Sequence, residues 1–60
     1  MRYMVLDETE QGMRRHESSM IIYGQIINDK DRTTWLVDIP DENFSEFMRY
    51  CKTNNLTVCG

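Results

Sequence analysis

Apolar residues recur with helical spacing most clearly in one part of the chain, the stretch from Asp38 to Asn55. Four apolar side chains there stand at i, i+3, i+4 and i+7, which places them on one face of a helix. These residues are Phe44, Phe47, Met48 and Cys51. The spacing predicts one amphipathic helix whose apolar stripe packs against the rest of the protein.

The ends of this helix also have sequence signals. Pro40 suits the first turn of a helix, because it lacks a backbone N–H and its φ is fixed. Asp41 is the expected N-cap, with Asp38 as the alternative. At the other end, Asn54 or Asn55 is expected to adopt the left-handed conformation that stops a helix.

The remaining apolar segments have the composition and alternation of β-strands. They are Arg2–Leu6, Ser19–Asn28, Thr33–Ile39 and Leu56–Cys59. A polar connection, Asp29–Arg32, suits a hairpin between the second and third segments. The long polar stretch Asp7–Ser18 is expected to be a loop, either mobile or interrupted by a short continuation of the first strand.

The predicted fold is therefore a single α+β domain over residues 1–60. Its elements follow in the order β-β-β-α-β, and the helix packs on one face of an antiparallel sheet of three to four strands. A chain of this length buries only about 60% of the surface that its unfolded form exposes, so we expect marginal stability.

The strongest predicted strand, Ser19–Asn28, is apolar on both faces. Its alternation places Met20, Ile22 and Ile26 on one side and Ile21, Tyr23 and Ile27 on the other. An antiparallel strand with one exposed face normally alternates apolar with polar residues. One helix cannot cover both faces of a sheet, so the second face needs another explanation.

Three explanations account for this second face. In the first, the loop Asp7–Ser18 folds across it, with Met13 as its only apolar contact. In the second, Gly24, which suggests a bulge, a sharp local twist or the close approach of another backbone, switches the face in mid-strand through a bulge. The third, which we favour, is that a homodimer partner or a protein target covers the face. The predicted partner-binding residues are Ile21, Tyr23, Ile27 and Leu36, with Glu42 and Glu46 at the rim.

The charge balance argues against a general nucleic-acid-binding protein, because 7 basic residues face 10 acidic ones and the formal charge is −3. The alternative hypothesis keeps a local basic patch of Arg14, Arg15 and Lys30, with aromatic side chains stacking on bases. The acids between Asp38 and Glu46 are explained by the positive end of the helix dipole, and only secondarily by docking on a basic partner.

No arrangement of residues specifies catalysis or metal binding. His16 is the only histidine, has no identifiable nucleophile and is expected in an exposed loop. Cys51 and Cys59 are eight apart, which is not zinc-ligand spacing. We expect them to be structural thiols, and we expect no metal and no cofactor.

These observations predict a non-enzymatic protein that docks on another macromolecule and regulates it. The first residues have no apolar region of the length that a signal peptide needs, and the longest apolar run, Met20–Tyr23, is far short of a membrane span. We therefore expect a cytoplasmic protein without a membrane partner.

Overall fold

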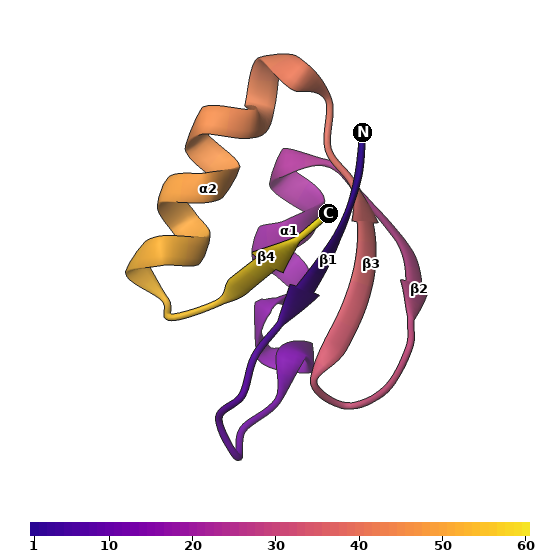
Figure 1. Ribbon diagram of the computed structural model, residues 1–60, viewed down its shortest axis with the longest axis vertical. Coiled ribbons are helices and arrows are strands. Elements are labelled where there is room, and N and C mark those ends of the chain that lie inside the picture. The colour runs from indigo at the N-terminus through magenta and orange to yellow at the C-terminus, as the bar shows by residue number, and fades with distance from the viewer.

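Four strands form one antiparallel sheet in the computed structural model, which describes residues 1–60 (Figure 1). The strands are β1 (Arg2–Leu6), β2 (Gln25–Asp29), β3 (Thr34–Asp38) and β4 (Thr57–Cys59). The helices are the 3₁₀ helix η1 (Met13–His16), α1 (Glu17–Tyr23), the 3₁₀ helix η2 (Asp41–Asn43) and α2 (Phe44–Thr53). The predicted α+β class with an antiparallel sheet is confirmed.

The order of the elements differs from the prediction. A helix between the first and second strands gives β-α-β-β-α-β, the order of the split βαβ motif, instead of β-β-β-α-β. The strands lie in the order β2-β3-β1-β4, so β1 and β3 occupy the centre of the sheet. Neither α-helix is long and apolar enough to cross a membrane.

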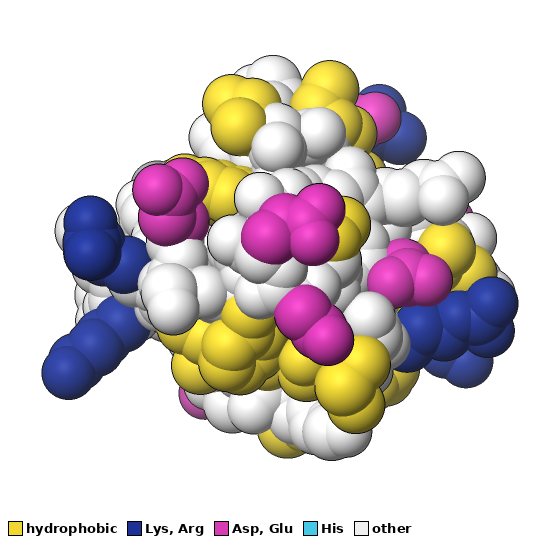
Figure 2. All heavy atoms as spheres, turned by 90° about the horizontal axis from the view of Figure 1, so that it is seen from above, with side chains coloured by type: hydrophobic (Ala, Val, Ile, Leu, Met, Phe, Trp, Pro, Cys, Tyr) yellow, Lys and Arg dark blue, Asp and Glu magenta, His cyan; other side chains and the backbone are white.

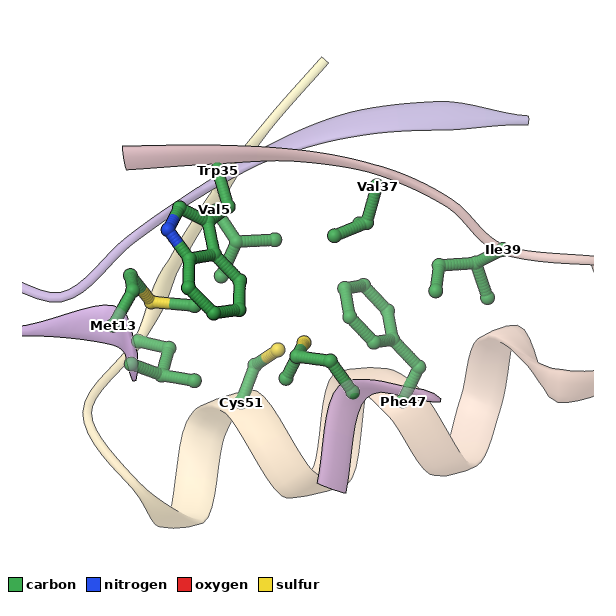
Figure 3. Packing of buried hydrophobic residues seen from close by; sticks show 9 residues of the cluster. Val5, Met13, Trp35, Val37, Ile39, Phe47 and Cys51 are labelled. Atoms are coloured by element: carbon green, nitrogen blue, oxygen red, sulfur yellow. The ribbon is translucent and has the colours of Figure 1, made fainter. Parts of the chain in front are cut away.

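The hydrophobic core lies between the sheet and the helices (Figure 3). Val5, Trp35 and Val37 point from the central strands towards Phe47 and Cys51 of α2. The full core has nine buried residues: Val5, Met13, Met20, Trp35, Val37, Ile39, Phe47, Cys51 and Leu56. The residues of β1 and β3 that face the helices are therefore the buried ones, and those between them face away.

The prediction of one strand over Ser19–Asn28 is wrong in its first half. Helix α1 takes residues up to Tyr23, and only the residues from Gln25 onwards form β2. The helical spacing is present in the sequence, since Met13, His16 and Met20 stand at i, i+3 and i+7 and are buried. Because the stripe includes the polar residue His16, its apolar helical periodicity is weak. The β-branched residues that follow favour a strand instead.

Gly24 joins α1 to β2 at a point where two backbones meet. A Cβ at this position would clash with the backbone carbonyl oxygen of Asp38 and press on the Ile39 side chain. Of the three alternatives for Gly24, the close approach of another backbone is therefore the one that the structure shows. The bulge itself lies further on, where Ile27 is the extra residue between the paired residues Ile26 and Asn28.

Helix α2 begins later than predicted. Asp41 does not cap it, because the residues after Pro40 form η2. The N-cap position of α2 is occupied by Asn43, whose side chain makes no capping hydrogen bond. The predicted ending is confirmed, since Asn55 has a φ of 59°. The Leu56 N–H then donates to the Cys51 carbonyl oxygen at 2.8 Å, which turns the chain back into β4.

Candidate functional site

The side of the sheet that faces away from the helices, here called the outer face, has an apolar centre. Met4 pairs with Leu36 on one side and with Cys59 on the other, so the three residues form a row across β3, β1 and β4. Leu6 is the next outward residue of β1 and lies between Thr34 and Thr57. No helix packs on this face, since both lie on the opposite side (Figures 1 and 3).

A second exposed apolar surface lies where α1 ends. The Ile21 and Ile22 side chains are 60% and 73% exposed, although they follow the buried Met20 directly. Asn43 Nδ2 donates to the Tyr23 carbonyl oxygen at 2.9 Å, which fixes the end of α1 beside η2. The C-terminal end of α1, which carries both isoleucines, therefore lies close to the acidic turn that precedes α2.

We call this surface the helical end; it consists of Ile21, Ile22, Asp41, Glu42 and Glu46. Figure 2 views the molecule from this end, with acidic side chains in the middle of the view and hydrophobic ones on either side. The Lys and Arg side chains lie at the margins of the same view. The surface is therefore both apolar and negatively charged.

A shallow hollow of about 350 Å³ adjoins the helical end between the two helices. Its aromatic part is made by Tyr23 and Tyr50, whose rings stack with centroids 5.7 Å apart. Glu46 and Arg49 bring one charge of each sign to the lining. The hollow has space for one side chain of a partner, with an aromatic surface and a carboxylate to contact it.

The six residues predicted to bind a partner do not share one surface. Leu36 lies on the outer face, as predicted, and Glu42 and Glu46 lie at the helical end. Ile21 and Tyr23 lie on α1 instead of the sheet, and Tyr23 is half-buried against the core. Ile27 is exposed at the bulge of edge strand β2.

A buried polar network that the sequence pattern does not predict joins the β1–η1 loop and η1 to α2. His16 is only 3% exposed, so the expectation of an exposed loop histidine is wrong. Its Nδ1 lies 2.6 Å from the Tyr50 hydroxyl, and its Nε2 lies 3.5 Å from Oδ2 of the fully buried Asp7. Arg15 Nε donates to the same Asp7 oxygen at 3.2 Å, and the Thr9 N–H donates to the other at 3.0 Å.

The environment of this network determines its protonation. Burial lowers the pKa of His16, and the Arg15 charge lowers it further, against a smaller opposite effect of Asp7. For Asp7, burial raises the pKa, but hydrogen bonds from Thr9 and Arg15 outweigh it and the net pKa is below its ordinary value. A neutral His16 that accepts from Tyr50 carries its proton on Nε2, which then faces the Asp7 carboxylate.

A histidine beside a carboxylate, as His16 is beside Asp7, resembles a general base held in orientation by an acid. However, His16 lines neither of the two surface hollows, so a substrate bound there would not reach it. The network joins the β1–η1 loop to α2, which is a structural role. Cys51 is buried, and burial raises its pKa to about 11, while Cys59 is exposed. No group of three His, Cys, Asp or Glu side chains is placed to hold a metal ion.

The three residues of the nucleic-acid alternative lie in different environments. Arg14 lines a charged hollow of about 400 Å³ together with Arg32 and two aspartates, Asp29 and Asp31. Arg15 pairs with Asp7, and Lys30 is exposed in the β2–β3 turn. Two of the three basic side chains therefore have carboxylates beside them.

Comparison with known proteins gives no matching family, no similar curated protein and no similar solved structure.

Proposed function

We propose that this protein is a non-enzymatic interaction protein that docks on a basic protein target through the helical end and regulates it. The observation that carries the proposal is the exposure of two consecutive isoleucines, at 60% and 73%. Large apolar side chains exposed side by side are a feature of interaction sites, where desolvation of a few anchors supplies most of the binding free energy. Ile21 and Ile22 are the expected anchors.

The charge around these anchors supports a basic target. Asp41 and Glu42 are both exposed beside the end of α1, and the turn that contains them has no Lys or Arg. Complementary charges at the rim of an interface raise the association rate and exclude partners of the same sign. A target surface with Lys or Arg around an apolar patch meets both conditions.

The adjoining hollow gives a basic side chain a place to bind. A Lys or Arg of the target that enters it contacts the faces of Tyr23 and Tyr50, an arrangement that stabilises a cation by about 0.5–2 kcal/mol. Glu46 adds an opposite charge at the same place, whereas Arg49 opposes a second cation. The hollow therefore favours one basic residue at this position.

The test is affinity capture of the tagged protein from its native cells, with and without nuclease, followed by mass spectrometry. The variant Ile21→Ala/Ile22→Ala removes both anchors, and Ile27→Ala is the matched control at another exposed isoleucine. Removing an anchor costs at least about 1–2 kcal/mol, so we expect at least about tenfold weaker binding of the captured protein.

A second pair of variants tests the charge. Glu42→Gln/Glu46→Gln neutralises two acids of the helical end, and Glu8→Gln/Glu10→Gln neutralises two exposed acids of the β1–η1 loop. We expect slower association only for the first variant. Retention of the target by Ile21→Ala/Ile22→Ala contradicts the proposal, and loss of all partners on nuclease treatment favours the alternative with Arg14, Arg15 and Lys30.

A further inference from the structure

The buried polar network reaches the hollow beside the helical end through one side chain, Tyr50. The Tyr50 hydroxyl lies 2.6 Å from Nδ1 of His16, and the Tyr50 ring stacks on Tyr23 with centroids 5.7 Å apart. Both tyrosines line the hollow, whereas His16 is only 3% exposed. Tyr50 therefore lies between the only histidine of the chain and the place proposed for a basic side chain of the target.

The carboxylate beside His16 is already paired with another cation. Arg15 approaches Oδ2 of Asp7 with Nε at 3.2 Å and with Nη2 at 3.1 Å, and the Thr9 N–H donates to Oδ1 at 3.0 Å. Nε2 of His16 lies 3.5 Å from the same Oδ2 and makes no hydrogen bond. Because the charges of Asp7 and Arg15 cancel, a proton added to His16 gives the network one net positive charge.

Three titratable or charged side chains face His16. They are Asp7 from the β1–η1 loop, Arg15 from η1 and Tyr50 from α2, and the next residue in the chain, Glu17, is exposed at the start of α1. Burial, followed by the Arg15 charge, lowers the pKa of His16 against a smaller opposite effect of Asp7. The neutral form is therefore the one present at neutral pH.

Protonation of His16 changes what the hollow offers to a cation in two ways. The charged side chains of the hollow itself, Glu46 and Arg49, cancel, so the added charge of His16 makes its surroundings positive. The hydrogen bond to Tyr50 also reverses, since protonated His16 has donors at both nitrogens and the Tyr50 oxygen must then accept. An accepting phenol has a less electron-rich ring, which binds a cation more weakly.

We propose that His16 is a proton-sensitive control of this hollow, and that its protonation releases the basic side chain of the target that binds there. This inference rests on the proposed function, because it concerns the same hollow. The His16 and Tyr50 ring centroids are 5.6 Å apart, so the two positive charges repel each other across one ring. By linkage, an occupied hollow opposes protonation of His16 by the same factor.

The test is NMR spectroscopy of the full chain with one basic side chain as the probe. The probe is Nα-acetyl-arginine amide at up to about 100 mM and constant ionic strength, a range that covers weak binding. Nα-acetyl-citrulline amide is its uncharged control. We expect the arginine probe to bind at pH 7.5 and at least about fivefold more weakly at pH 5, with no such change in His16→Asn. Circular dichroism establishes that both proteins are folded at both pH values.

A second measurement needs no variant. The imidazole signals give the pKa of His16, which should be lower with the arginine probe present and unchanged by the citrulline probe. If His16→Asn does not fold, this measurement on the unmodified chain decides.

Three results overturn the proposal. The first is equal binding of the arginine probe at both pH values in a protein whose His16 has taken up its proton. The second is an equally large fall of binding in His16→Asn, because another group is then responsible. The third is unfolding before His16 takes up its proton, because the folded protein then has only one state of the hollow.

These failures are distinguishable from a failure of the proposed function. Absence of arginine binding at pH 7.5 excludes the hollow as a cation site, and with it the control by His16. Docking through Ile21 and Ile22 is tested separately, by affinity capture. Retention of the target by Ile21→Ala/Ile22→Ala contradicts that docking surface and does not alter the binding of the probe in the hollow.

Discussion

The two faces of the sheet are made by alternating residues of the same strands, yet only one of them is covered. On β3, Val37 is fully buried under α2, while its neighbour Leu36 is half-buried without any helix above it. On β1, Val5 and Met4 show the same difference. The inner apolar residues of these strands therefore stabilise the fold through burial, whereas the outer ones leave apolar surface exposed to water.

The largest expected loss of folding stability comes from a substitution on the covered side of the sheet. Phe47→Ala removes a fully buried ring that contacts the core between α1 and the sheet, and such truncations cost about 3–5 kcal/mol. This is comparable with the whole stability of a small domain, so we expect a largely unfolded protein by circular dichroism. Phe44→Ala is the matched control, since Phe44 is 36% exposed and we expect its loss to cost much less. Equal effects of the two variants would contradict the assignment of the core.

A smaller effect separates the two faces within one strand. Val37→Thr buries a hydroxyl without a partner, which costs about 1–3 kcal/mol of the free energy of unfolding. Leu36→Thr places the same side chain on the outer face, where water reaches it, and we expect a loss of less than about 1 kcal/mol. Urea denaturation measures both losses, and a larger loss for Leu36→Thr would reverse the roles of the two faces.

The buried histidine below the covered face gives a pH dependence of stability. The folded-state pKa of His16 is lowered, so the unfolded chain binds the proton more readily than the folded one. Stability is therefore fully present above about pH 6.5, the pKa of an unperturbed histidine, and falls as the pH drops through the folded-state pKa. Thermal unfolding at pH 7.5 and pH 5 measures this loss.

The variant His16→Asn keeps a hydrogen-bonding group near Tyr50 but does not titrate, so it should lose most of this dependence between pH 7.5 and pH 5. The lowered pKa of Asp7 acts separately, because its stabilising contribution is lost only in stronger acid, below the ordinary value of 3.8. An unchanged pH dependence in His16→Asn would show that another group is responsible.

The smallest effect concerns the two thiols, which lie on opposite sides of the sheet. Cys51 is buried in the core and burial raises its pKa to about 11, while Cys59 is exposed at the end of the apolar row of the outer face. At pH 8 a thiol reagent should modify Cys59 first and Cys51 only after denaturation. Cys59→Ser should abolish the reaction of the folded protein, and rapid reaction of two thiols per native chain would contradict the burial of Cys51.

The sequence predicts one half of the molecule much better than the other. The strands β1 and β3 and the helix α2 have clear periodicity, and Phe47 and Cys51 of the predicted helical stripe are buried as expected. The region between Met13 and Tyr23 was misassigned, because its helical stripe contains a histidine whose partner, Asp7, comes from the preceding loop. A buried polar pair of this kind depends on contacts between distant residues, and the local pattern cannot show it.

The candidate surfaces were predicted only in part for the same reason. Leu36 could be placed from the alternation of its strand, whereas Met4 and Leu6 join it only because β1 is the neighbour of β3 in the sheet. The alternation places Ile21 on the uncovered face of a strand and Ile22 on the opposite face, but both residues lie on helix α1, where their side chains are exposed. The order of the strands and the start of α1 depend on contacts between distant residues. The two surfaces can therefore be identified only from the three-dimensional structure.

The most direct test of the difference between the two faces is methyl NMR of the unmodified protein with a soluble paramagnetic agent added. We predict broadened signals for the methyl groups of Met4, Leu6 and Leu36, which are partly exposed, and sharp signals for those of the buried Val5 and Val37. Equal broadening of both sets, in a protein that remains folded, would contradict the assignment of the covered and outer faces.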